Sequence, residues 1–396
     1  MAGGPQCSAV DHAGHCPRGN RAPRDDLPLH AHDARHDRLR ARWAGGGGVT
    51  PWRTYADPAV IDSQRSADEQ VFAGRTLRDS VTFSDALTGV PTGIVVPLIG
   101  ISDIGGVGAV DGGASALVLD VLDVDDALPG PWEWDVVGLA GSLGERAIRA
   151  LAEGYQQGVA AIGREPLHSA RGRALAIAGR MARGEDALSY PDGVRRLVGK
   201  GAQPELRADR VAARWHQPVS GRPPPSDLAR EFAQYRETVS ESVAALLGNY
   251  RVTDALVSED GRLMVLLARG QRDVVLLEAL PVSASTWEPR AGAWRAGSDV
   301  QRVLLARETV PLAPLTMLGW STSPDGAVSR VWSRARGSDR SKRDAKGSGT
   351  RRRAHDAGVL LGLVHALGGD AGMLSGYLGR SGRFADALVD AVRPAA

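Results

Sequence analysis

The stretch from Ala116 to Ser142 constrains the fold of this chain more than any other. Its first part, Leu117 to Val124, is dominated by branched and apolar residues, which is typical of a β-strand. Leu128 to Pro131, with the sequence LPGP, then ends the strand, because proline lacks an N–H donor and glycine permits unusual backbone angles. The apolar positions that follow recur at helical spacing: Val136, Leu139, Leu143, Ile148 and Leu151. We therefore expect a strand, a rigid turn and a helix, in this order.

Four carboxylates gather at the end of the predicted strand: Asp120, Asp123, Asp125 and Asp126. Carboxylate oxygens suit Mg²⁺, a hard cation that often bridges protein ligands to substrate phosphates. A solvated acidic turn is the alternative interpretation, and spacing alone favours it because acidic turns are common. Asp135, at the end of the same stretch, is well placed to cap the helix that follows.

Residues 119–142 read LDVLDVDDALPGPWEWDVVGLAGS, and this block resembles the most recognisable segment of the bacterial domain-of-unknown-function family 2252. Members of that family read approximately FDLNDFDETLPGPWEWDVKRLAAS here. The resemblance identifies the chain as a divergent member and implies a fold related to protein kinases and aminoglycoside phosphotransferases. In that interpretation Asp120 or Asp123 occupies the metal-binding position, and Asp120, Asp123 and Asp125 are the candidate metal ligands if Mg²⁺ is bound. Trp132, Trp134 and Asp135 are then structural residues of the motif.

The resemblance reappears in the second half of the chain. Residues 246–251 (LLGNYR) are similar to the LL..YR of the family. Residues 363–384, which read LVHALGGDAGMLSGYLGRSGRF, resemble a family segment that ends in YLGRSDRF. His365 matches a family histidine, and we interpret it as a packing residue, because a lone histidine on a helix is usually one. The likeness covers about residues 65–396.

The order of the segments predicts an α+β, kinase-like bilobal fold that is circularly permuted. In ordinary kinases the β-rich nucleotide lobe precedes the catalytic loop. Here the catalytic-loop-like hairpin, residues 93–135, precedes the β-rich part at about 250–335. We expect five parts: a disordered tail (1–50), a helical lobe (51–248), a β-rich nucleotide-lobe-like segment (249–335), a basic disordered loop (336–354) and C-terminal helices that return to the helical lobe (355–396).

Local patterns predict further elements within these parts. Residues 93–98 are typical of a strand, and residues 100–108 of a turn-rich loop that leaves it. Residues 184–225 are polar and interrupted by proline and glycine, so we expect an irregular segment there. Ser226 is expected to cap a helix that continues through Gly248. Residues 263–268 and 274–280 predict a hairpin, and residues 298–308 predict a short helix.

The residues that would perform catalysis in such a fold are largely replaced. The family pattern CGDAHLxNFG aligns with residues 99–108, which read IGISDIGGVG. Ile101 therefore stands at the family aspartate and Gly106 at the family asparagine. Asp103 is the one candidate base, displaced by two residues along the loop. A displacement of that size usually defeats catalysis, because catalytic geometry tolerates errors of only about 1 Å.

The nucleotide-binding groups are replaced as well. Leu277 stands at the position of the family lysine, and the three lysines of the chain (Lys200, Lys342 and Lys346) lie outside the predicted strands. The glycine-rich turn is reduced to Glu259-Asp260-Gly261, whose carboxylates would repel phosphate. An arginine, Arg262 or Arg272, would have to replace the lysine. That exchange is not conservative, because a guanidinium is a planar fork and an ammonium is a compact point charge.

Three functions remain open, and the favoured one is a catalytically degraded pseudoenzyme with a scaffold or regulatory role. The second is an active phosphotransferase that uses ATP and Mg²⁺, with Asp103 as base and Asp123 and Asp125 as metal ligands. The third is a non-enzymatic interaction protein that works through the basic stretch 334–353. That stretch has no aromatic residue for base stacking, so an exposed disordered loop is favoured over a nucleic-acid site, and a protein partner stays open.

Composition and the N-terminal segment add few constraints. A net charge of +2 argues neither for nucleic-acid binding nor for a strongly acidic surface. Cys7, His12, His15 and Cys16 have the residue types of a zinc site, but their spacing fits no familiar finger. No apolar run is long enough for a transmembrane helix or a signal-peptide core. We therefore expect a cytoplasmic protein.

Overall fold

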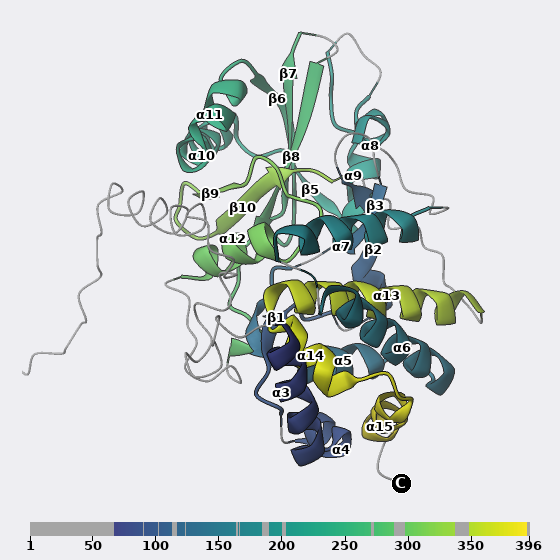
Figure 1. Ribbon diagram of the computed structural model, residues 1–396. Coiled ribbons are helices and arrows are strands. Elements are labelled where there is room, and N and C mark those ends of the chain that lie inside the picture. The colour runs from purple at the N-terminus through teal and green to yellow at the C-terminus, as the bar shows by residue number, and fades with distance from the viewer. Residues whose placement is uncertain are drawn as a thin grey trace, which may run out of the picture. The chain divides into compact units, whose positions relative to one another are not determined.

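The fold was analysed in a computed structural model of the chain. The structure describes residues 67–89, 91–101, 103–112, 117–122, 124–163, 165, 167–183, 190–199, 203–270, 273–288, 298–336 and 348–393. The predicted tail 1–50, with its cysteines and histidines, lies outside these residues, as do Asp123, Arg272 and the three lysines. Within the described residues, helices combine with antiparallel sheets, which confirms the α+β class (Figure 1).

A six-stranded antiparallel sheet is built in the order β5-β6-β7-β8-β10-β9. Its strands are β5 (Val219–Gly221), β6 (Arg251–Ser258), β7 (Leu263–Arg269), β8 (Asp273–Pro281), β9 (Gly319–Thr322) and β10 (Ser329–Arg334). The predicted hairpin of residues 263–268 and 274–280 is confirmed as β7 and β8, paired from Leu263–Ala279 to Arg269–Asp273. Six consecutive residues of β7 are buried, so this central strand is covered on both faces of the sheet.

The two faces of this sheet carry different helices. One face packs against α10 (Pro225–Thr238) and α11 (Glu241–Leu247). Phe232 and Tyr235 of α10 lie there in one apolar cluster with every second residue of β7, namely Leu263, Val265 and Leu267. The other face packs against α8 (Tyr190–Leu197) and α9 (Ala208–Trp215). Helix α12 (Asp299–Thr309) contacts β10. Ser298 caps α12 by accepting a hydrogen bond from the backbone N–H of Gln301, which confirms the short helix predicted there.

Two short antiparallel strand pairs form the region of the acidic block. Strand β1 (Val95–Leu98) pairs with β4 (Leu128–Pro131), and β2 (Val107–Asp111) pairs with β3 (Leu117–Val121). The predicted strand that begins at Leu117 is therefore confirmed, but it ends at Val121 and not at Val124. The rigid turn predicted at Leu128–Pro131 is wrong, because these residues pair with β1 as strand β4. The loop predicted for residues 100–108 contains a short 3-10 turn, η2 (Ile104–Gly106), and the start of β2. Helix α5 (Trp132–Ala140) follows β4 without an intervening residue.

The remaining helices pack on one another and on the strand pairs β1–β4 and β2–β3 (Figure 1). They are α3 (Ala67–Ser80), α4 (Phe83–Thr88), α6 (Glu145–Ile162), α7 (Leu167–Met181), α13 (Ser348–Gly368), α14 (Ala371–Leu378) and α15 (Arg383–Val392). The α6–α13 contact is unusually close because glycines line it. A Cβ atom added to Gly358 would lie 2.2 Å from the carbonyl oxygen of Leu151, and one added to Gly158 would lie 2.2 Å from that of Val359.

Three predicted boundaries are wrong. The helix expected from Ser226 to Gly248 is divided into α10 and α11, because Val239 adopts an extended backbone (ψ 170°). No side chain caps α10, so Ser226 is not its cap. The irregular segment expected at 184–225 contains α8, α9 and β5. The basic loop expected at 336–354 is helical from Ser348 onward, and residues 337–347 lie outside the described residues.

None of the helices in the described ranges is both long and apolar enough to cross a membrane.

Candidate functional site

Asp135 has a different role from the one that its position predicted. The helix α5 begins at Trp132, its cap position is Pro131, and no side chain caps it. The carboxylate of Asp135 instead accepts hydrogen bonds from the backbone N–H groups of Ile99 (2.6 Å) and Gly100 (2.9 Å). Gly100 has a φ of 75°, a left-handed conformation that favours glycine. Asp135 therefore fixes the turn at which the chain leaves β1.

Asp135 also ends a buried chain of polar side chains. The Nε2 atom of His365 lies 3.1 Å from Asp135 Oδ2, and its Nδ1 atom lies 2.9 Å from the hydroxyl of Tyr155. All three side chains are buried. Burial raises the pKa of the Tyr155 phenol well above its ordinary value, so the hydroxyl keeps its proton. In the His365 tautomer that donates from Nε2–H to Asp135, Nδ1 accepts a hydrogen bond from this hydroxyl.

The two tryptophans of the motif pack in different surroundings. Trp132 is fully buried, stacks on Tyr155 with ring centroids 5.6 Å apart, and donates from Nε1 to the hydroxyl of Thr92. Trp134 stacks on Trp287, with centroids 5.6 Å apart and an interplanar angle of 17°. Trp287 follows β8, so Trp134 connects the motif to the β-rich segment.

Asp120 is completely buried at the end of β3. Its Oδ1 atom accepts from the N–H groups of Val121 (2.8 Å) and Leu312 (3.0 Å), and its Oδ2 atom accepts from that of Ala313 (3.0 Å). Arg336 forms an ion pair with Oδ2 at 3.3 Å. Burial raises the pKa of this carboxyl although these four contacts each oppose the change. The carboxylate of Asp120 thus connects β3 to the residues before β9, Leu312 and Ala313, and to Arg336 after β10.

Asp125 is bound by an arginine of α12. Arg307 contacts its Oδ1 atom through Nε (2.9 Å) and Nη2 (2.7 Å), and Nη2 also lies 3.0 Å from Oδ2. A second arginine of the same helix, Arg302, donates to the backbone carbonyl groups of Asp125, Ala127 and Ser283. Both guanidinium groups are buried. The acidic turn is therefore held against α12 by side-chain and backbone acceptors together.

Asp126 completes this set of contacts. Its Oδ1 atom accepts from the backbone N–H of Thr286 at 2.7 Å, and its Oδ2 atom accepts from the Thr286 hydroxyl. The Ser285 hydroxyl donates to the backbone carbonyl of Asp126 at 2.8 Å. Asp120, Asp125 and Asp126 thus each bind a different piece of residues 283–336. We call these three aspartates and their partners the acidic joint.

A small cavity of about 70 Å³ lies beside the acidic joint. Its charged lining consists of Arg214, Arg307, Arg336 and Glu278. Glu278 lies 3.0 Å from Arg214 and accepts from the indole N–H of Trp215. Burial would raise the pKa of Glu278, but the contacts with Arg214 and Trp215 and the charge of Arg307 together lower it. Burial lowers the pKa of Arg336, and Asp120 opposes this change.

The structure separates the predicted catalytic groups. Asp103 is exposed, and its Oδ1 atom accepts from the N–H of Gly105, so it caps the 3-10 turn. Arg262 binds its neighbour Asp260 at 2.8 Å. Leu277 is buried in the core between the sheet and α10. Asp123, a predicted metal ligand, lies outside the described residues, so the three-aspartate metal site stays a prediction.

The carboxylate oxygens of Asp120 and Asp125 accept hydrogen bonds from an arginine or from backbone amides in this structure. Over the ranges that the structure covers, no three His, Cys, Asp or Glu side chains are arranged to hold a metal ion.

The sequence interpretation missed the arginines that bind the acidic turn. One signal was present: Val300, Val303, Leu304 and Arg307 share one face of α12, because their spacing is i, i+3, i+4 and i+7. An arginine on an apolar helical face is expected to be buried with a partner. Nothing in the sequence indicates that its partner is Asp125, which is remote along the chain.

Fold and site together define an α+β protein in which an acidic turn before a buried tryptophan motif joins helices to an antiparallel sheet. Residues 81–395 match the family described as uncharacterized protein conserved in bacteria (DUF2252). The chain belongs to this family, as the resemblance of residues 119–142 implied. Comparison with curated proteins gives no match. Comparison with solved structures gives none either.

Proposed function

We propose that this protein is a kinase-like pseudoenzyme with a scaffold or regulatory role, and that its acidic block now serves structure. The observation that carries the proposal is that protein groups already bind the carboxylates of Asp120 and Asp125. Their carboxylates bind Arg336, Arg307 and backbone amides, which leaves them unsuited to neutralise a transferring phosphoryl group. The carboxylate of the candidate base Asp103 accepts a hydrogen bond from the backbone N–H of Gly105 in its own turn.

The connectivity of the β-rich segment supports the kinase-like part of the proposal. Three consecutive antiparallel strands, β6, β7 and β8, precede α12, and β9 and β10 follow it in the same sheet. In protein kinases a lysine on the third strand forms an ion pair with a glutamate on helix αC. Here the third strand carries Glu278 and the next helix carries Arg307, and both line one cavity. The charges on the strand and the helix are thus reversed relative to that pair, and Leu277 stands at the position of the family lysine.

The experiment that tests the proposal is thermal unfolding of the purified protein with ATP, with Mg²⁺, with both and with neither. A ligand that binds only the folded state at 100 times its dissociation constant adds about 2.7 kcal/mol to stability. We expect no stabilisation that requires both ATP and Mg²⁺. An Mg²⁺-dependent shift that disappears in Asp123→Ala would overturn the proposal and favour an active phosphotransferase. Asp103→Ala serves as the matched control for loss of one carboxylate.

A further inference from the structure

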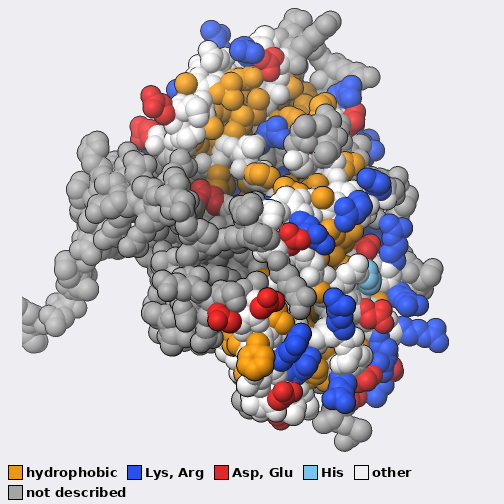
Figure 2. Space-filling view, in the orientation of Figure 1, with side chains coloured by type: hydrophobic (Ala, Val, Ile, Leu, Met, Phe, Trp, Pro, Cys, Tyr) orange, Lys and Arg blue, Asp and Glu red, His pale blue; other side chains and the backbone are white. Residues whose placement is uncertain are grey.

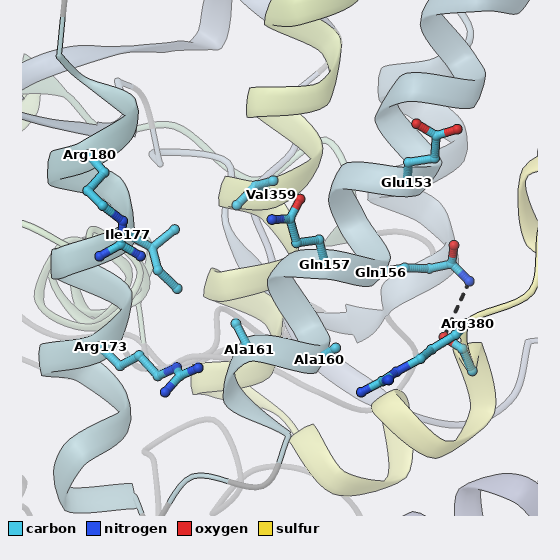
Figure 3. Close-up of a pocket in the computed structure, with 11 residues that line it drawn as sticks. Glu153, Gln156, Gln157, Ala160, Ala161, Arg173, Ile177, Arg180, Val359 and Arg380 are labelled. Atoms are coloured by element: carbon cyan, nitrogen blue, oxygen red, sulfur yellow. Dashed lines mark hydrogen bonds between the residues drawn. The ribbon is translucent and has the colours of Figure 1, made fainter.

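A groove of about 570 Å³ lies between α6 and α7, away from the acidic joint (Figure 3). Its other walls are Val359 of α13 and the turn that follows α14, at Gly379 and Arg380. The volume lies within the range of sites that hold small organic molecules. None of its lining residues takes part in the contacts of Asp120, Asp125 or Asp126.

Arginines stand on two sides of this groove. Arg173 and Arg180 are seven residues apart on α7 and therefore project from the same helical face, two turns apart. Figure 3 shows both on one helix, with Arg380 on the opposite side and Gln157 between them. Basic side chains also gather over α6, α7 and the start of α13 on the face drawn in Figure 2. Arginines therefore lie on both walls of the groove.

The charge of the groove is not balanced by its own lining. Arg173 forms an ion pair with Glu165 at 2.7 Å. Neither Arg180 nor Arg380 forms an ion pair with any residue that the structure describes. Glu153 is the only acidic residue among the described lining residues. Two guanidinium groups thus remain to bind an anion, and arginine binds phosphate through paired N–H donors.

The turn that carries Arg380 is held in place before any ligand arrives. The side-chain amide of Gln156 donates to the carbonyl groups of Leu378 (3.2 Å), Gly379 (3.4 Å) and Ser381 (3.2 Å). Gly379 has a φ of 60°, a conformation that favours glycine. A fixed backbone lowers the entropy that binding would otherwise cost.

Beside Gln157, the surface between the arginines includes an apolar floor. Ala160 and Ala161 of α6, Ile177 of α7 and Val359 of α13 form it. A ligand that complements both the floor and the walls has an anionic group and an apolar body. We propose that this groove binds a small organic phosphate, with the phosphate on Arg180 and Arg380 and the apolar body on this floor. This inference is independent of the proposed function, because it uses neither nucleotide nor Mg²⁺.

The test is calorimetric titration of the full chain with phenyl phosphate, in the absence of Mg²⁺ and nucleotide and at constant ionic strength. We expect saturable binding, weaker binding of inorganic phosphate, and no binding of phenol. Arg380→Gln and Arg180→Gln should each weaken phenyl phosphate binding about tenfold, because each removes a charged hydrogen-bond donor. Both side chains are exposed, so an unchanged unfolding temperature is expected and checks that the variants fold.

Arg146→Gln is the matched control, because Arg146 is an exposed arginine of α6 that does not line the groove. It should leave the affinity unchanged. The proposal is overturned if phenyl phosphate fails to bind at millimolar concentration, or if all three variants reduce binding equally. It is also overturned if a hexaglutamate peptide binds through Arg180 and Arg380 while phenyl phosphate does not, since the partner would then be an acidic peptide.

Discussion

Asp120 shows how a single carboxylate can hold distant segments together. It is fully buried, and three backbone N–H groups and Arg336 contact it. Removing one partner of a buried ion pair leaves an uncompensated charge and costs about 3–5 kcal/mol. We therefore predict that Asp120→Ala lowers the free energy of unfolding by about this amount, as measured by urea denaturation. Asp103→Ala, which removes an exposed local cap, should cost only about 1 kcal/mol. Equal losses for the two variants would contradict this role.

Glu133 is a buried carboxylate with an incomplete set of partners. Its Oε1 atom accepts from the N–H and the hydroxyl of Thr92, whereas Oε2 has no hydrogen-bond partner in the described part of the chain. Burial raises its pKa above the ordinary value of 4.5. The folded state therefore binds this proton more tightly than the unfolded state. The resulting stabilisation is fully present below pH 4.5 and is lost as the pH rises through the folded-state pKa.

Glu133→Gln removes this titration, and its effect should therefore depend on pH. We predict that wild type becomes more stable relative to the variant when the pH falls from neutral towards the ordinary glutamate pKa. Urea unfolding of both proteins across this range measures the difference. Because Asp120 titrates in both proteins, its contribution cancels. A stability difference that is constant with pH would contradict the prediction.

At the level of elements, the α6–α13 contact depends on glycine. A methyl group on Gly358 would lie 2.2 Å from the carbonyl oxygen of Leu151, so the two helices would have to separate. Overpacking of this kind costs about 1–3 kcal/mol. We predict a loss of stability in this range for Gly358→Ala in thermal or urea unfolding.

Gly172→Ala provides the control for this prediction. Gly172 is exposed on α7, and nothing lies within 4 Å of an added Cβ. Alanine has a higher helix propensity than glycine, so this variant should gain up to about 1 kcal/mol. If Gly358→Ala and Gly172→Ala change stability in the same direction, close packing of α6 on α13 is not the reason for a glycine at position 358.

Elements with strong local signals could be predicted from the sequence. Apolar runs identified β7 and β8, and the predicted short helix that begins at Ser298 is α12. Helices α8 and α9 were missed because they have few apolar residues and are stabilised by packing on the sheet, through Val194, Leu197, Val211 and Trp215. Tertiary contacts of this kind override a weak local pattern.

The candidate site was predicted less completely, for a related reason. The motif located Asp120, Asp125, Trp132 and Asp135, but their partners are remote in the sequence. The spacing of Asp135 after a proline-rich turn is compatible with a helix cap, yet the side chain binds the turn after β1 and His365. Local sequence cannot identify which distant group a buried carboxylate contacts.

For the molecule as a whole, the acidic joint is where the strand pairs β1–β4 and β2–β3 meet the β-rich segment. Arg307 reaches Asp125 from α12, Arg336 reaches Asp120 from the end of β10, and Trp287 stacks on Trp134. Under the proposed function, these protein donors take the place that metal ions hold beside the carboxylates of an active phosphotransferase.

The measurement that tests this account most directly is a double-mutant cycle between Asp125 and Arg307, with urea unfolding in the presence and absence of millimolar Mg²⁺. Arg307 is buried and Asp125 is one-quarter exposed, so we expect Asp125→Asn to cost about 2 kcal/mol. Asp125→Asn and Arg307→Met should show a coupling energy of about 1–3 kcal/mol, and Mg²⁺ should not change it. Negligible coupling, together with an Mg²⁺-dependent stabilisation that is lost in Asp125→Asn, would contradict the account and indicate a metal site instead.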